Sequence, residues 1–287
     1  MLKVWFMIVM VVNVAFSANS FMSLEELLTQ AQRWKVDVGF QFNQVKETVF
    51  GANVEKVEIF PGLEAPLTIP YSETIDQNSI GGILSVKYGI NASTELYASF
   101  HHQWKWVMKD KNITRTAVFS SNHNQFRLGV NQKILKESYF PAIIAYFETA
   151  PFEYIETDLG MYQSTHFSMF HGGLRIYKSI DPVVINVILG STKHRTKTSN
   201  RIKYGDEFEI SPSLYFTIND EITLNWGMLA RYNEKQFRSG KLAHLSQRQL
   251  SFNMGLGYMI EYDWTMSVNG IFSHNNYGGS IQSSYQF

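Results

Sequence analysis

The last nine residues, Gly279–Phe287 (GSIQSSYQF), alternate with a period of two and end the chain on an aromatic residue. Ile281, Ser283, Tyr285 and Phe287 share one face of the predicted strand, and the polar residues between them share the other. A barrel that crosses a lipid bilayer needs such an end, because its final strand must pair with its first so that no backbone edge stays open. The alternative is an ordinary edge strand with an exposed tail, and the upstream sequence decides between the two.

The first residues of the chain have the layout of a secretory signal peptide. Lys3 provides a positive start, Val4–Val14 form a short apolar run, and Ala15 and Ser17 are small residues at the positions that precede a cleavage site. We therefore predict that residues 1–17 are a signal peptide cleaved after Ser17. The apolar run is too short to span a bilayer, so a retained membrane anchor is the weaker alternative.

The composition suits a barrel in a membrane. The 287 residues include no cysteine, so backbone pairing rather than disulfides must stabilise the exported chain. Aromatic residues make up 15% of the chain and charged residues only 17%, which suits an aromatic lipid-facing band around a polar interior. The formal net charge is zero, so nothing indicates nucleic acid as a partner.

Residues 18–33 are predicted to contain one short helix ahead of the barrel. Ser23 followed by Glu26 makes a capping box at its start. A helix of about ten residues is near the lower limit for a helix in water, so it must pack on something. It either caps the barrel mouth through weak contacts or inserts into the lumen as a plug, and its apolar stripe favours the plug. The stripe consists of Leu24, Leu27, Leu28 and Ala31.

From Trp34 onward the sequence period changes to two, which predicts strands with one apolar and one polar face. In the first strand, Trp34, Val36 and Val38 alternate with Lys35 and Asp37. Further segments follow the same pattern, so about twelve strands are expected, an even number as single-chain bacterial barrels require. These segments are Ile83–Ile90, Thr94–Lys105, Gln125–Leu135, Phe140–Phe152, Thr165–Ser179, Val183–Thr192, Glu207–Phe216, Glu221–Tyr232, Gln247–Met259, Trp264–Ser273 and the terminal strand.

The connections between these segments alternate between short and long. The short turns are 91–93, 136–138, 180–182, 217–220 and 260–263, and the longer polar stretches are 44–82, 106–124, 153–164, 193–206 and 233–246. Tight periplasmic turns and longer outer loops are typical of an outer-membrane barrel, whereas a soluble sandwich scatters its loop lengths. We therefore predict an all-β fold, an antiparallel transmembrane β-barrel of about 12 strands over residues 34–287, in the outer membrane of a Gram-negative cell.

Two His-x-Ser pairs offer an enzymatic alternative. They are His166 with Ser168 and His244 with Ser246, and residues two apart on a strand share a face, so an imidazole could deprotonate the hydroxyl beside it. Outer-membrane phospholipase A and lipid A deacylase use that spacing, but this chain departs from the residues that follow their serine. No third group at a motif distance orients either histidine. We therefore expect no enzymatic activity and keep lipid hydrolysis as an alternative.

Charged residues of both signs fall on the predicted inner face. They either set the selectivity of a pore or pair across strands to fill the interior, and the second role is the simpler for any one residue. Glu207 and Glu209 share this face and would repel unless a cation opposes them. His101 and His102 point to opposite faces, so they cannot chelate one metal and no metal site is predicted. The selectivity candidates are Lys35, Asp37, Lys87, Glu95, Lys105, Arg127, Lys133, Glu207, Glu209 and Arg231, with Asp263 as a further lumen charge.

Three segments resemble a known family. Ser85–Phe100 (SVKYGINASTELYASF) is similar to the strand-turn-strand unit of the outer-membrane transporter family named for the MetA pathway of phenol degradation. Ile176–Gly190 (IYKSIDPVVINVILG) resembles its Asp-Pro turn and following apolar strand, and Tyr204–Asp220 (YGDEFEISPSLYFTIND) resembles its Gly-Asp entry into a strand. The similarity covers most of the chain after Ala31. It implies an outer-membrane channel or transporter, often for hydrophobic compounds, and it carries no substrate residues with it.

The end of the chain also resembles the signal that the barrel-assembly machinery reads, with Phe287 last and Tyr285 two positions earlier. The expected partners are this machinery, outer-membrane lipids, lipopolysaccharide and an unidentified solute; no cofactor is expected. The expected function is the passive passage of a small solute, hydrophobic if the resemblance is a guide, with lumen polarity setting selectivity. The alternatives are an export barrel for a secreted polypeptide, a surface lipid hydrolase and a structural or adhesive barrel.

Overall fold

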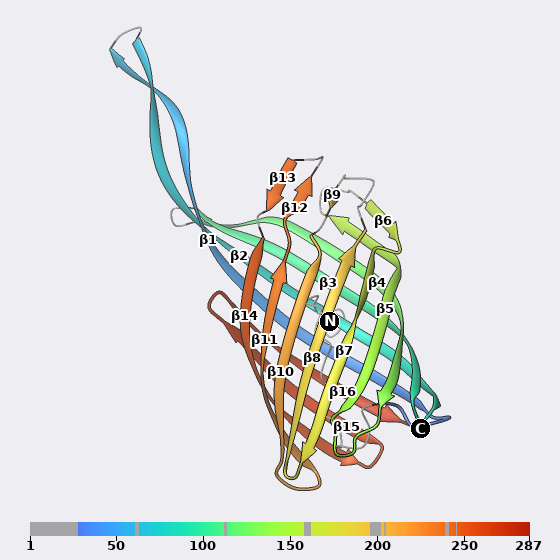
Figure 1. Ribbon diagram of the computed structural model, residues 1–287. Coiled ribbons are helices and arrows are strands. Elements are labelled where there is room, and N and C mark those ends of the chain that lie inside the picture. Colours follow the sequence, from blue (N-terminus) through green and yellow to red (C-terminus); the bar gives the residue numbers. More distant parts are fainter. Residues whose placement is uncertain are drawn as a thin grey trace, which may run out of the picture.

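The computed structural model describes residues 28–60, 63–111, 114–157, 162–195, 202–203, 205–238, 241–244 and 246–287. In this part of the chain twelve antiparallel strands form a closed barrel, and the last pairs with the first (Figure 1). They are β1 (Trp34–Phe60), β2 (Leu63–Asn91), β3 (Thr94–Lys111), β4 (Thr114–Leu135), β5 (Ala142–Thr157), β7 (Met169–Ile180), β8 (Val183–His194), β10 (Glu207–Thr217), β11 (Ile222–Asn233), β14 (Gln247–Glu261), β15 (Trp264–Ser273) and β16 (Asn276–Gln286). Shorter strands are β6 (Tyr162–His166), β9 (Ile202–Lys203), β12 (Gln236–Arg238) and β13 (Lys241–His244).

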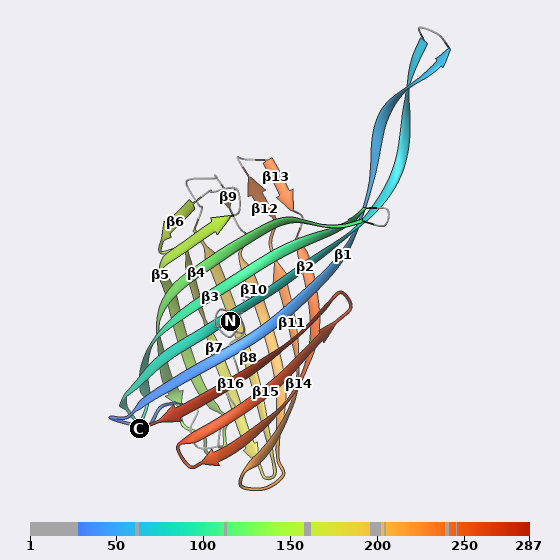
Figure 2. The same cartoon turned by 180° about the vertical axis from the view of Figure 1, so that it is seen from behind.

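The barrel confirms the predicted fold class, and each predicted strand corresponds to one barrel strand except Thr165–Ser179, which is divided at 167–168 between the end of β6 and β7. Its two ends differ. The short connections 92–93, 136–141, 181–182, 218–221 and 262–263 lie at one end, which we call the turn end. The other end, which we call the loop end, holds the longer connections with β6, β9, β12 and β13 and the ends of the β1–β2 and β3–β4 hairpins (Figures 1 and 2). The connection 274–275 between β15 and β16 is also at the loop end and is as short as the turns.

The chain terminus closes the barrel. β16 pairs with β1 from Lys35, opposite Gln286, to Val45, opposite Asn276. Beyond that ladder, the Trp34 and Phe287 backbones exchange two hydrogen bonds, each of 2.9 Å. The last residue is therefore part of the closing seam, as a spanning barrel requires, because lipid offers no hydrogen bonds to an open edge.

The two faces of the barrel wall have opposite chemistry. On β11, Trp226 points outward and is 60% exposed, whereas its neighbour Asn225 points inward and is 2% exposed. Large apolar side chains dominate the exposed outer positions, and serine, asparagine, glutamine and charged side chains dominate the buried inner ones. A soluble protein would place these classes the other way round. The wall is therefore built for an apolar solvent outside and a polar lumen inside.

Aromatic side chains concentrate near both ends of the outer face. Near the turn end, the rings of Trp34 and Tyr88 lie 4.7 Å apart between centroids. Towards the loop end of β3, the rings of Trp104 and Trp106 lie 4.9 Å apart. Such rings prefer the boundary between lipid and water, so these two groups mark the edges of the apolar band.

One hairpin extends well beyond the barrel. β1 loses its partner β16 after Val45 and β2 loses its partner β3 before Thr74, yet the two strands stay paired as far as Phe60 and Leu63 (Figures 1 and 2). The stretch 44–82, predicted as a loop, is therefore mostly a continuing strand pair, and 106–124 likewise continues β3 and β4. The prediction was wrong here because it took the first polar residues as the end of each strand. Polar residues end the apolar band that faces lipid, but the backbone hydrogen bonds of an antiparallel pair can continue in water.

Residues 28–33 turn from the start of β1 into the barrel at the turn end. Gln32 is left-handed (φ 61°), and its N–H donates to the Gly89 carbonyl at 2.6 Å. Ala31 forms a parallel bridge with Gly89, where a Cβ would collide with the Gln30 carbonyl. Only glycine allows the segment to approach β2 this closely.

The predicted N-terminal helix lies mostly outside the described residues, since these do not include Leu24 or Leu27. Residues 28–31 are described and are not helical. The predicted signal peptide, residues 1–17, also lies outside the described part. Among the described residues, no helix is long and apolar enough to span a membrane.

Candidate functional site

The inward side chains leave a cavity of about 210 Å³ inside the barrel. One water molecule needs only about 10–15 Å³, so there is room for a small solute with its water. Serine, asparagine and glutamine side chains line much of it, and apolar contributions come from Ile83, Ile144, Leu229 and Ile271. The lining also includes the cations Lys87, Arg127 and Arg175 and the carboxylates Asp37, Glu148 and Glu209.

Asp37 and Lys87 form one ionic pair of the cavity wall, across β1 and β2. Lys87 Nζ lies 2.8 Å from Asp37 Oδ2, and the Ser284 hydroxyl of β16 donates to Asp37 Oδ1 at 2.6 Å. The carboxylate is almost fully buried, and both of its oxygens have a partner. A buried charge is tolerated only when it is paired in this way.

Arg127 and Glu148 form a second pair, across β4 and β5. Arg127 Nη1 lies 2.9 Å from Glu148 Oε1, and the Tyr97 hydroxyl donates to Glu148 Oε2 at 3.0 Å. Arg127 Nε also donates to Gln125 Oε1 at 2.6 Å. The Tyr97 ring lies across its cross-strand partner Gly129, where a Cβ would collide with the ring. Side chains from three strands are thereby fixed in one network.

Arg231 of β11 opposes both Glu207 and Glu209 of β10. Its Nη2 lies 3.2 Å from Glu209 Oε2, and its Nε lies 3.9 Å from Glu207 Oε2. His194 Nε2 lies 3.2 Å from Glu207 Oε1. The cation that the two neighbouring glutamates need is therefore present, and three of the predicted lumen residues belong to one network.

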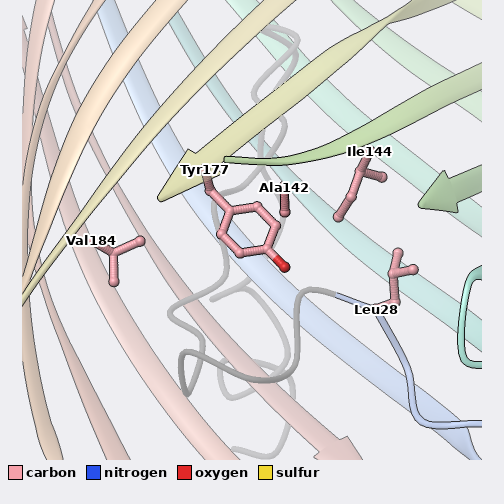
Figure 3. Packing of buried hydrophobic residues seen from close by; sticks show 5 residues of the cluster. All are labelled: Leu28, Ala142, Ile144, Tyr177 and Val184. Carbon is pink, nitrogen blue, oxygen red and sulfur yellow. The ribbon is translucent and has the colours of Figure 1, made fainter. Parts of the chain in front are cut away.

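Glu95 holds the N-terminal segment. The Thr29 N–H and the Thr29 hydroxyl both donate to Glu95 Oε2 at 2.6 Å, and Asn131 Nδ2 donates to Oε1 at 2.6 Å. Next to Thr29, Leu28 is buried inside the barrel (Figure 3). It belongs to the apolar cluster of Ala142, Ile144, Tyr177 and Val184. A charged hydrogen bond and an apolar contact thus fix the segment in the lumen at the turn end.

The other predicted charges lie at different heights of the barrel. Lys35 is buried and lies nearer the turn end than the Asp37–Lys87 pair. Lys105 lies towards the loop end of β3 and Lys133 near the turn end of β4, and neither is among the residues that line the cavity. Asp263 lies at the rim, where Arg33 Nη1 is 3.0 Å from its Oδ1.

The adjacent histidines of β3 point to opposite sides of the wall. His101 is buried in the lumen, with its Nε2 2.9 Å from the Ser99 hydroxyl. His102 faces outward, with its Nδ1 2.5 Å from Asn124 Oδ1. Within the described ranges, no group of three or more histidine and carboxylate side chains is arranged to hold a metal ion.

Sequence reasoning missed several lining residues, among them Glu148, Tyr146, His171 and Arg175. The Tyr146 and His171 rings lie 5.1 Å apart between centroids, and His171 Nδ1 lies 2.8 Å from the Thr192 hydroxyl. Alternation along β7 could have found His171 and Arg175: His171 follows the outward Phe170, and Arg175 lies between the apolar residues Leu174 and Ile176. The pair Gly172-Gly173 obscured that alternation, since it adds no side chain to either face.

His166 and Ser168 do not face each other. His166 is exposed on the outer face, where its ring lies 5.2 Å from the Phe152 ring between centroids, whereas Ser168 is buried. Phe167 between them has a φ of 50°, which breaks the period of two. The predicted shared face is therefore wrong for this pair. In the second pair, the side chain of His244 lies outside the described residues.

Comparisons with known proteins support the fold. No protein-family model matches the chain, and no curated protein matches it in sequence. Among solved structures, an outer membrane channel from Pseudomonas putida F1 superposes with a TM-score of 0.64 at 9% identity, over 96% of this chain and 100% of that one. The transport unit of the autotransporter AIDA-I from Escherichia coli gives 0.55 at 9% identity, over 93% of each chain. At such low identity these likenesses show a shared β-barrel fold.

Proposed function

We propose that this protein is an outer-membrane channel through which a small solute passes passively. The observation that carries the proposal is the cavity: it lies inside a closed barrel whose outer face is apolar and whose inner face is polar and charged. Fixed charges and hydrogen-bonding groups along a lumen are the means by which a pore selects its solute. The shared fold with the Pseudomonas putida channel supports this function.

We propose further that residues 18–33 plug the turn end, which would face the periplasm. The support is local: Thr29 is tied to Glu95, and Leu28 packs in the apolar cluster of the inner wall. Residues 1–17 would be removed on export. The closing seam at Phe287 is consistent with recognition of this end by the barrel-assembly machinery, and the apolar band would contact outer-membrane lipids and lipopolysaccharide.

The solute would be small and partly hydrophobic. The apolar lining side chains Ile83, Leu229 and Ile271 lie between polar ones, so a molecule with an apolar body could contact them without losing all of its water. The resemblance to transporters of the phenol-degradation pathway favours the same class of solute. In the described part of the chain, no observation favours polypeptide export or lipid hydrolysis over this role.

Single-channel conductance in planar bilayers tests both proposals. The mature chain is compared with a variant that lacks residues 18–32 and so retains Arg33 and the whole of β1. We expect a several-fold higher conductance in the deletion variant, because the docked segment no longer narrows the lumen. Tyr139→Ala, which changes an exposed turn-end residue outside the cavity lining, is the matched control.

Two results would contradict these proposals separately. No conductance in either form would refute the channel. An equal conductance in both forms would refute the plug and leave the channel in place.

A further inference from the structure

Arg175 differs from the other charged side chains that line the cavity. Each lining carboxylate has a cation partner: Lys87 for Asp37, Arg127 for Glu148 and Arg231 for Glu209. The lining cations Lys87 and Arg127 are used in these pairs. Among the described residues, Arg175 makes no ion pair and no side-chain hydrogen bond, so its guanidinium is the one lining charge that these pairs leave over.

The wall around Arg175 is apolar. On β7 it lies opposite Ile144 of β5 and Ile188 of β8, which are 2% and 1% exposed. Tyr177, two residues along the same face, belongs to the apolar cluster at the turn end. An arginine on such a wall loses part of its water and gains no protein anion in return, which leaves it strongly disposed to bind an anion that enters.

The other charges near Arg175 do not neutralise it. Lys87 is close enough for the two positive charges to act on each other. Tyr146 and Tyr215 also lie within its electrostatic reach, and both are neutral hydroxyls. The carboxylates Glu148 and Glu209 also act on Tyr146, but each is paired with another arginine, Arg127 or Arg231. The guanidinium of Arg175 therefore lines the cavity without a carboxylate of its own.

We propose that Arg175 binds the carboxylate of a small amphipathic organic anion whose apolar body lies against Ile144, Leu229 and Ile271. A guanidinium matches a carboxylate with two parallel N–H···O bonds, and the apolar lining accepts the rest of the molecule. This deepens the proposed channel function, on which it rests for the route of the solute. Binding itself can be measured without any flux.

Isothermal titration of the mature, full-length protein in detergent tests the site with three probes. Hexanoate has both a carboxylate and an apolar body, hexanamide lacks the charge, and acetate lacks the body. We expect hexanoate to bind at least about tenfold more tightly than either, because loss of one charged hydrogen-bonding partner or of several buried methylenes each has about that effect.

Arg175→Gln should abolish the preference for hexanoate over hexanamide, and Arg175→Lys should retain part of it. Arg248→Gln is the matched control, because Arg248 is an exposed arginine of β14 that does not line the cavity, and it should leave the preference unchanged. Unchanged near-ultraviolet circular dichroism of each variant shows that the barrel is folded.

The inference is overturned if wild-type protein binds hexanoate and hexanamide equally, or if Arg175→Gln keeps the preference. It is overturned in its apolar part if acetate binds as tightly as hexanoate. Hexanoate flux into liposomes, measured with the same variants, separates the two proposals: selective binding without flux in the wild type or in the variant lacking residues 18–32 would refute the channel and keep the site.

Discussion

The outer and inner faces of this barrel are made by the same strands, yet they depend on different physics. Outside, Trp226, Met228 and Met254 need only an apolar surrounding, and no specific neighbour is required of them. Inside, Arg127 and Glu148 are useful only together, because either one alone would be a charge without a partner. The outer face should therefore be sensitive to an added charge and indifferent to shape. The inner face should tolerate an added charge in its polar lumen but be sensitive to shape and to the loss of a partner.

A charge on the outer face should have the largest effect. Met254→Arg places a cation in the middle of the apolar band and should lower the free energy of unfolding by about 2–4 kcal/mol. Asn269→Arg, on the adjacent strand but facing the cavity, should lower it by less than about 1 kcal/mol, because water and carboxylates are in reach. Guanidinium unfolding from lipid vesicles measures both. Equal losses would show that the two faces do not differ as described.

The face on which a side chain lies was easier to predict from sequence than the partner that it meets. A period of two is a local property, so the inward positions of Asp37, Lys87 and Arg231 followed from alternation alone. Their partners did not, because pairing depends on the register between strands. Arg127 meets Glu148 next to an irregularity in the β4–β5 ladder, where Phe126 pairs with Phe152 and Leu128 with Thr149. Pro151 lies within that shift and could have marked it, because a proline inside a strand is typical of a bulge. The sequence still does not show which side chains meet across it.

The parts that sequence reasoning missed share this cause. The fate of the His166 pair depended on one left-handed residue, Phe167, and the long β1–β2 hairpin depended on a ladder that continued past its apolar band. Alternation could have placed Arg175 on the inner face. Its lack of an ion-pair partner could be recognised only once the partners of the other lining charges were known. The face of a side chain is thus predictable from sequence along an unbroken strand, whereas breaks in the strand, pairing between strands and the exceptions to pairing are not.

Shape on the inner face should have the next largest effect. Gly129→Ala puts a methyl group where the Tyr97 ring lies, so the ring must move and give up its bond to Glu148. We expect a loss of about 1–3 kcal/mol in the free energy of unfolding. Gly39→Ala is the matched control, because a Cβ there meets only ordinary contacts of 3.9 Å or more. A similar loss in both variants would mean that the close fit at Gly129 does not matter.

Removal of a single partner on the inner face should have a smaller effect. Ser284→Ala deletes the hydroxyl that donates to Asp37 but leaves Lys87 in place. The expected loss is about 1–2 kcal/mol, since a hydrogen bond to a charged group is lost while the ion pair survives. The same unfolding titration measures it, with Ser280→Ala as a control on the same strand. A loss above that of Gly129→Ala would reverse the proposed order of shape over single bonds.

The smallest effect on the free energy of unfolding is expected from substitution of Ser168, which the sequence placed on the same face as His166. His166 lies on the outer face and Ser168 on the inner face, so the imidazole cannot deprotonate the hydroxyl. Ser168→Ala removes only a long contact of 3.4 Å with Gln125 Nε2, so the change in stability should be below about 0.5 kcal/mol. Hydrolysis of phospholipid in mixed micelles should be at background level in the wild type and unchanged in Ser168→Ala and His166→Ala. Activity that both substitutions abolish would mean that the two side chains meet across the wall in a conformation other than this one, and the separation of the two faces would fail at that point.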